Sequence, residues 1–135
     1  MYRGLILIAL LVFTGCGDPN KGVVSGTILV DGEPAEGSIS FVPVDGKTAP
    51  QGDMIEEGKY EVELPVGQTK VEIRVARVIG QKRLYETDPN SEVANIYEES
   101  LPPKFNDETE LTYEVPSGKS TKDFDLEAKK KKKRR

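Results

Sequence analysis

The stretch KYEVELPVGQTKVEIRV, residues 59–75, decides the fold class of this chain. Apolar side chains occupy every second position on both sides of a Pro-Val-Gly turn at residues 65–67, and charged side chains stand between them. Successive side chains of a β-strand point to opposite faces, so a period of two predicts strands with one buried and one solvated face. We therefore expect half-buried strands at residues 59–64 and 70–75.

The same β pattern continues in both directions from this stretch. Further strand-like runs occur at residues 23–30, 38–42, 51–55 (the weakest), 111–115 and 124–126. Turn sequences such as Asp31-Gly32-Glu33-Pro34 separate the runs roughly every ten residues, and no convincing helical period appears. About seven short strands with this spacing predict an all-β sandwich that forms a single domain. We place that domain at residues 23–127 and expect four aromatic side chains in its core: Phe41, Tyr60, Tyr113 and Phe124.

Residues 79–100 interrupt the rhythm and are predicted to be a long loop. Within them, Val93–Glu99 fits either a single helical turn or a short strand. A connection of this length inside a compact domain is a candidate for function or for disorder. Tyr85 and Tyr97 are the aromatics that the core does not need. They form either a contact surface for sugar or protein, or a means of packing the loop down onto the body.

The chain begins with a short basic start and an apolar run that ends at Gly15, followed by Cys16, the only cysteine. This order is typical of a secretory signal peptide, residues 1–15. The residues Thr14-Gly15-Cys16 resemble the lipobox of bacterial lipoproteins. That resemblance implies cleavage before Cys16, a diacylglyceryl group on its sulfur, and an extracytoplasmic protein anchored to the inner or the outer membrane. Residues 16–22 would then be a lipidated N-terminus and tether.

Two other interpretations of Cys16 are a buried apolar thiol and a cysteine within an uncleaved membrane anchor. The apolar run of about nine residues is short for a span, because crossing a bilayer takes about 20 apolar residues. The lipoprotein interpretation is therefore preferred.

Charge is distributed unevenly along the chain. Lys and Arg total 19 and Asp and Glu total 23, but the last seven residues are all basic, which leaves 12 positive against 23 negative charges elsewhere, a net −11. Residues 128–135 are predicted to be a disordered tail. Its cations would contact a polyanion such as lipid headgroups, lipopolysaccharide phosphates or wall polymers, or would only solubilise the chain. They are Lys129, Lys130, Lys131, Lys132, Lys133, Arg134 and Arg135.

The composition argues against catalysis and metal binding. The chain has no histidine, and lipidation would consume its single thiol, so no nucleophile–base pair can be assembled. The acidic groups at residues 107–110 and at Asp123 and Asp125 do not match the spacing of a calcium loop. We expect no catalytic residue, no metal and no cofactor. Nucleic acid is a disfavoured partner, because a signal peptide removes the protein from the cytoplasm and no aromatic residue interleaves with the lysines.

Several stretches together carry a resemblance to a known domain family. The opening at residues 24–27, 31–37 and 39–43 and the later Gly58-Lys59-Tyr60 and Pro65-Val66-Gly67 resemble carboxypeptidase-regulatory-like domains. That resemblance implies a transthyretin-like (prealbumin) Greek-key sandwich without catalytic activity. Residues 102–106, 111–115 and 124–126 are similar to the ends of small planctomycete-type lipoproteins of unassigned function. The sequence thus favours a non-catalytic structural or protein-interaction module of the cell envelope, and the alternative is a protein that binds envelope carbohydrate or wall polymer.

Overall fold

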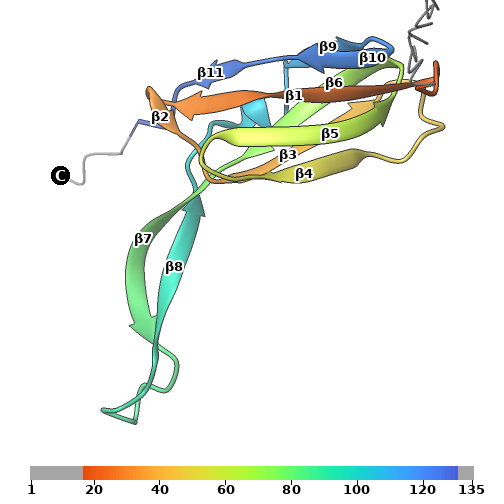
Figure 1. Ribbon diagram of the computed structural model, residues 1–135. Coiled ribbons are helices and arrows are strands. Elements are labelled where there is room, and N and C mark those ends of the chain that lie inside the picture. Colours follow the sequence, from red (N-terminus) through yellow and green to blue (C-terminus); the bar gives the residue numbers. More distant parts are fainter. Residues whose placement is uncertain (1–16, 131–135) are drawn as a thin grey trace, which may run out of the picture.

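The computed structural model describes residues 17–130, and in them the chain is an all-β sandwich with a long projecting hairpin (Figure 1). The first sheet is built around β1 (Lys21–Val30). On one side β1 pairs antiparallel with β5 (Lys59–Pro65) and β2 (Glu33–Pro34). On the other side it pairs in parallel with β10 (Gly118–Thr121) and then with β11 (Phe124–Leu126).

The second sheet is antiparallel throughout and has four strands. Its order is β4 (Gln51–Ile55), β3 (Gly37–Pro43), β6 (Gly67–Arg74) and β9 (Thr112–Val115). A single turn of 3₁₀ helix, η1 (Pro103–Phe105), precedes β9. The remaining two strands, β7 (Ala76–Arg83) and β8 (Val93–Glu99), pair with each other outside both sheets.

The stretch 59–75 behaves as its period of two predicts, because the apolar positions of β5 and β6 are buried and most of the others are exposed. The two strands do not form a hairpin with each other. β5 belongs to the first sheet and β6 to the second, so the turn between them crosses the sandwich. Gly67 makes this crossing with a φ of 139°, a conformation that residues with a side chain rarely adopt.

The core lies between the two sheets. Three of the four expected core aromatics, Phe41, Tyr60 and Phe124, are almost completely buried. The ring centroid of Tyr60 lies 6.2 Å from that of Phe41 and 6.4 Å from that of Phe124. Tyr113 is partly buried against the same cluster. The buried polar side chains are also satisfied; for example, Thr69 Oγ1 donates to Tyr113 O at 2.7 Å.

The expectation of a loop over residues 79–100 is wrong, because most of this segment forms β7 and β8. Val93–Glu99 is a strand, which confirms one of its two interpretations and rules out the helical turn. The apolar–polar pattern of the sequence did not predict these two strands, for two reasons. A bulge between Val78 and Gly80 shifts the period, and neither face lies in the core, so apolar and polar side chains occur on both. β7 and β8, together with the short β2 and β10, bring the number of strands among residues 17–130 to eleven, four more than the seven expected.

Candidate interaction arm

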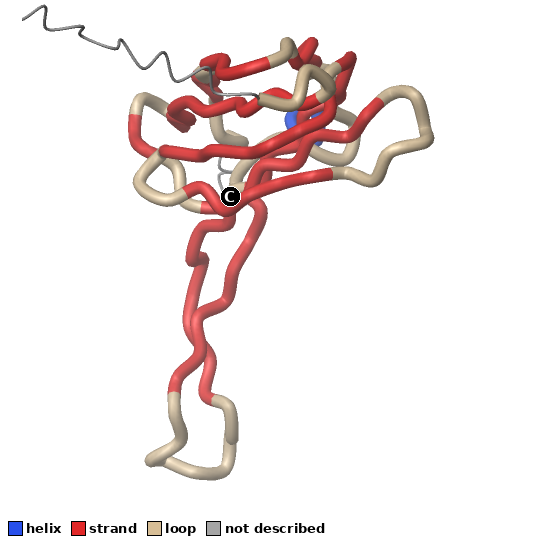
Figure 2. The backbone as a smooth tube through the Cα atoms, turned by 45° about the vertical axis from the view of Figure 1, so that its right-hand side comes forward, coloured by secondary structure: helices blue, strands red, loops and turns tan. Residues whose placement is uncertain are grey.

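The feature that sets this domain apart is the β7–β8 hairpin, residues 76–99, called the arm below. Figure 2, turned from the view of Figure 1, shows that it projects well clear of the sandwich. The paired region extends from Ala76 opposite Glu99 to Arg83 opposite Val93. A two-stranded ribbon standing alone is marginally stable in water at best, so the arm depends on how its root is held.

The root of the arm is fixed by hydrogen bonds between Val75 and residues 99 and 100, at the end of β8 and just after it. Glu99 Oε1 accepts from the backbone N–H groups of Val75 and Leu101, each at 3.0 Å. Ser100 N and Ser100 Oγ both donate to Val75 O, at 2.8 and 2.5 Å. Val75, Ser100 and Leu101 are all buried. Both strands of the arm therefore leave from one well-ordered point at the edge of the core.

An ion pair beside the root adds to this anchoring. Arg74 Nη2 lies 2.6 Å from Asp107 Oδ1, and this hydrogen bond raises the pKa of the guanidinium. Asp107, one of the acids weighed as a calcium ligand, is thus engaged by Arg74. Asp123, from the other acidic group, accepts from Thr27 N at 2.8 Å.

Most of the exposed large apolar side chains of the described residues belong to the arm. Seven of the ten lie there, which is unusual for so small a part of the domain. They are Val78, Ile79, Leu84, Tyr85, Val93, Ile96 and Tyr97. A soluble surface normally scatters such groups singly, so their concentration on one projecting ribbon indicates a contact surface.

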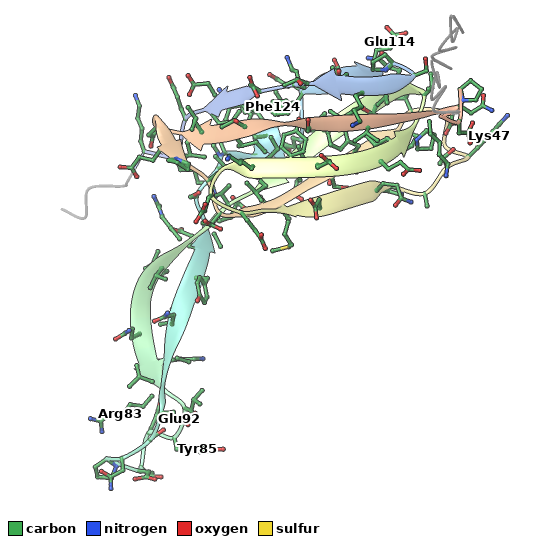
Figure 3. All side chains as sticks on the ribbon, viewed as in Figure 1. Lys47, Arg83, Tyr85, Glu92, Glu114 and Phe124 are labelled. Carbon is green, nitrogen blue, oxygen red and sulfur yellow. The ribbon has the colours of Figure 1, made fainter. Side chains whose placement is uncertain are left out.

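Tyr85 and Tyr97 are the most exposed members of this set, at 69% and 62%. The interpretation that these rings pack the segment onto the body is therefore wrong, and their role as contact residues remains a prediction. Tyr85 lies near the far end of the arm (Figure 3). Tyr97 stands midway along β8, opposite Val78.

The two faces of the arm carry different side chains. The pairings place Val78 with Tyr97, Gln81 with Asn95 and Arg83 with Val93 on one face, called the Tyr97 face. Gln81 Nε2 donates to Asn95 Oδ1 at 3.0 Å on this face.

The opposite face, called the Ile96 face, carries Arg77 paired with Glu98, Gly80 with Ile96 and Lys82 with Ala94. A methyl group placed on Gly80 would lie 3.8 Å from Ile96 Cδ1, so Ile96 leans over this glycine. Arg77 Nη2 and Glu98 Oε2 form an ion pair at 3.0 Å.

The tip of the arm, residues 84–92, is an acidic and internally hydrogen-bonded turn. Leu84 N donates to Glu92 O at 3.0 Å, and Tyr85 N donates to Ser91 Oγ at 2.8 Å. The tip contains Glu86, Asp88 and Glu92 and no basic residue. Its three carboxylates therefore form a concentrated negative charge at the end of an otherwise mixed-charge ribbon.

The C-terminal segment meets the arm at its root. Ala128 N donates to Asp31 Oδ1 at 3.2 Å, and Lys129 N donates to Ser100 O at 2.7 Å. Lys129 and Lys130 are the described part of the expected basic tail, and Lys131–Arg135 lie outside the described residues. The chain thus enters its run of seven cations beside the arm.

The described N-terminal residues lie at the other end of the sandwich. β1 begins at Lys21 and runs its ten residues, roughly 33 Å of extended chain, toward the end from which the arm leaves (Figure 1). Residues 1–15 and Cys16 lie outside the described residues, so the signal peptide and the lipid anchor remain predictions. In residues 17–130 no helix has the length and apolar character needed to cross a bilayer.

One open groove of about 1040 Å³ lies on the sandwich between β4 and β5. Its lining is strongly acidic and includes Glu36, Asp53, Glu56, Glu57 and Glu61 with a single lysine, Lys59. Two of these carboxylates accept backbone hydrogen bonds: Glu36 from Glu57 N at 2.9 Å and Asp53 from Glu61 N at 3.4 Å. Across residues 17–130, no three acidic, His or Cys side chains gather in a way that could hold a metal ion.

Tyr60 is the titratable side chain of this region with a perturbed proton affinity. Burial raises the pKa of its phenol, and its hydroxyl donates to Lys122 O at 2.5 Å. Because the ring is also part of the core, the perturbation belongs to packing, and Tyr60 is not a candidate acid or base.

Sequence reasoning identified Tyr85, Tyr97 and the tail lysines but missed the other members of the arm. Val78, Ile96 and Glu99 have their roles, as exposed apolar groups and as the anchor of the root, only once β7 and β8 have paired. The signal that could have revealed the ribbon is Val93-Ala94-Asn95-Ile96-Tyr97, an uncharged run in which Val, Ile and Tyr favour a strand. No protein-family model matches this chain, and no curated protein matches it.

Proposed function

We propose that this protein is a non-catalytic, lipid-anchored module of the bacterial cell envelope that binds protein through the β7–β8 arm. The observation that carries the proposal is the arm itself, which exposes seven large apolar side chains on a ribbon that the body leaves uncovered. Surfaces of this kind mark interaction sites in soluble domains. The resemblance to carboxypeptidase-regulatory-like domains, which lack catalytic activity, is consistent with a binding role.

The position of the arm suits an anchored protein. The lipobox resemblance implies a lipid on Cys16, directly before the described N-terminal residues, and the arm leaves from the opposite end of β1. A domain held by lipid at one end would present the arm and the start of the tail away from that end. Two or more acyl chains, at about 0.8 kcal/mol per buried methylene, hold a protein stably on a membrane.

Two measurements test the proposal. The first is the intact mass of the protein extracted from bacterial membranes, expected to equal Cys16–Arg135 plus a diacylglyceryl group, with or without an N-acyl chain. An unmodified chain that starts at Met1 would refute the anchor. The second is site-specific photo-crosslinking in cells, with a benzophenone amino acid at Tyr85 and, as a matched control on the exposed face of β9, at Glu114. Protein adducts from Tyr85 and none from Glu114 are expected; equal adducts from both would remove the arm as the binding surface.

A second candidate function is binding of an anionic envelope polymer or carbohydrate. The observation that favours it is chemical: Tyr97, Gln81 and Asn95 share one face of the arm, and the cationic tail begins at the root of the arm. An aromatic ring beside amide groups suits a sugar, and cations suit its acidic substituents. Co-sedimentation with purified wall polymer tests this. Retention that a Tyr97→Ala change abolishes would favour the polymer over a protein partner.

A further inference from the structure

The outer edge of β8 is an unprotected strand edge. In the described residues β8 pairs only with β7, so one row of its backbone N–H and C=O groups has no strand partner. Natural proteins protect such edges with lysine, proline or a bulge. β7 has the bulge at Val78/Gly80 and the cations Lys82 and Arg83, whereas residues 93–97 of β8 have no charge, no proline and no bulge.

We infer that this edge binds the same edge of a second copy of the chain. The two β8 strands run antiparallel about a two-fold axis at Ile96, which makes a continuous sheet in the order β7-β8-β8-β7. The inference rests on the proposed function, which assigns the arm as the contact surface, and it names the protein that the arm binds.

The residues that this register places opposite one another are compatible. Ile96 faces Ile96 of the second copy, Asn95 faces Tyr97, Ala94 faces Glu98 and Val93 faces Glu99. No two like charges are opposed, which would be destabilising across a strand pair. Ile96 and Ala94 of both copies form one apolar patch on the Ile96 face.

The register also brings Lys82 toward the carboxylate of Glu98, which is ion-paired with Arg77 of its own arm. Lys82 pairs with Ala94 in its own arm, and Ala94 faces Glu98 of the second copy, so the three residues form one row on one face. Two strand spacings separate the backbones of Lys82 and Glu98, about 10 Å, and the small Ala94 leaves space for both long side chains to meet above it. Neither Lys82 nor Arg83 has an ion pair among residues 17–130.

The tip and the tail support the antiparallel direction. Continuing the register places Glu92 opposite Ser100 of the second copy, so each acidic tip reaches the root of the other arm. That root is where Lys129 N binds Ser100 O and the run of seven cations begins. Three carboxylates thus lie toward Lys129 and Lys130 of the second copy, the described start of that run. A parallel pairing would instead bring the two acidic tips together, and their repulsion disfavours it.

The contact made by two arms is smaller than a standard interface, which buries about 800 Å² per partner. Such a dimer is weak in dilute solution. Copies held on one membrane surface raise each other's effective concentration, which favours pairing without any additional contact. The charge pairs at tip and tail are exposed and are weakened by salt.

Cysteine crosslinking of the full chain in bacterial cells tests the pairing. Directly opposed residues in an antiparallel pair have Cα atoms about 4.5–5.5 Å apart, within the range that a disulfide spans. Ile96→Cys should therefore give a dimer band on mild oxidation, about tenfold stronger than that of Gln81→Cys on the far strand, because only the first position faces its own copy. The unsubstituted chain, with Cys16 alone, is the blank.

The register has its own control. Asn95→Cys and Tyr97→Cys, each expressed alone, should give little dimer, whereas the two expressed together should crosslink to each other. No dimer from Ile96→Cys, an equal band from Gln81→Cys, or dimers from either single variant as strong as the mixed pair would overturn the proposed pairing.

The tip–tail contact is tested in the Ile96→Cys background by Glu86→Gln, Asp88→Asn and Glu92→Gln together. The rate of crosslinking should fall severalfold at low ionic strength, and added salt should remove the difference. An unchanged rate would overturn the tip–tail contact. Adducts of a different protein from the benzophenone at Tyr85, without an Ile96→Cys dimer, would overturn the second copy and leave the proposed function standing. If both experiments show nothing, both proposals fail.

Discussion

The side chain of Glu99 accepts a hydrogen bond from the backbone N–H of Val75 at 3.0 Å, across the root of the arm. Val75 precedes β7 and Glu99 ends β8, so this contact links the two points where the arm joins the body. The same carboxylate oxygen also accepts from Leu101 N. One side chain therefore satisfies two backbone groups that the sheets leave without a partner.

Replacing Glu99 should loosen the root of the arm. Glu99→Ala leaves two backbone donors without their acceptor, and an unsatisfied donor at a partly buried site costs about 1–3 kcal/mol. Amide hydrogen exchange should quicken at residues 75–83 and 93–101 and change little in β1, β3 and β6. Glu99→Gln, which keeps an acceptor oxygen, is the control, and equal exchange in both variants would refute the role of this hydrogen bond.

The arm should be dispensable for folding of the sandwich. Val75 and Ser100 are already hydrogen-bonded to each other, so an Asn-Gly turn can join them in place of residues 76–99. No residue of the arm belongs to the core cluster. We expect the shortened chain to keep a cooperative thermal transition, with a midpoint lowered because the deletion also removes the Glu99 carboxylate that accepts from Val75 N and Leu101 N. Loss of cooperativity in circular dichroism would show that the arm is part of the folding unit.

Gly26 should tolerate no side chain. Its position in β1 lies beside the carbonyl of Lys122, and a Cβ built there would be 2.0 Å from that oxygen. Gly26→Ala must therefore displace the link between β10 and β11, at a cost of roughly 1–3 kcal/mol or more. Urea unfolding measures the loss. Gly80→Ala in the arm, where the nearest atom is 3.8 Å away, is the matched control and should change the body's stability little.

Tyr60 should make stability fall at high pH. Burial raises the pKa of its phenol in the folded state above the value of about 10 that an exposed tyrosine has. The unfolded chain therefore loses the proton first, and the stability contributed by this group is complete below about pH 10 and declines as pH rises further. Tyr60→Phe removes this dependence, and it removes the hydrogen bond to Lys122 O at a cost of about 1 kcal/mol. Urea unfolding at pH 8 and pH 11 compares the two chains. An equal decline in the free energy of unfolding of both would show that a group other than Tyr60 causes the pH dependence.

The all-β class and the positions of most body strands follow from local pattern. In Tyr60, Val62 and Leu64, and again in Val71 and Ile73, the period of two is a direct consequence of burying one face of a strand. The turn at Asp31-Gly32 is equally local, since both residues adopt a positive φ, and such turns favour Asp and Gly. These features need only neighbours in the chain, which explains why they could be predicted.

The arm could not be predicted in the same way, because its strands do not bury a face in the core. Val78, Ile96 and Tyr97 are apolar but exposed. The bulge at Ile79 also breaks the apolar–polar alternation from which β7 could have been predicted. For a strand that owes its order to its partner strand and to its root, periodicity carries little information.

Three properties can be read from the order of residues alone: a half-buried β structure, a run of seven cations at residues 129–135, and the absence of histidine. The folded arrangement was needed to see that β5 and β6 separate into different sheets and that β10 and β11 run parallel to β1. It was also needed to see that Lys129 lies against Ser100 at the root of a projecting arm. The difference lies in the sequence separation of the interactions, because alternation and turns depend only on neighbouring residues. Strand order and the meeting of residues 29 positions apart depend on how the whole chain closes around its core.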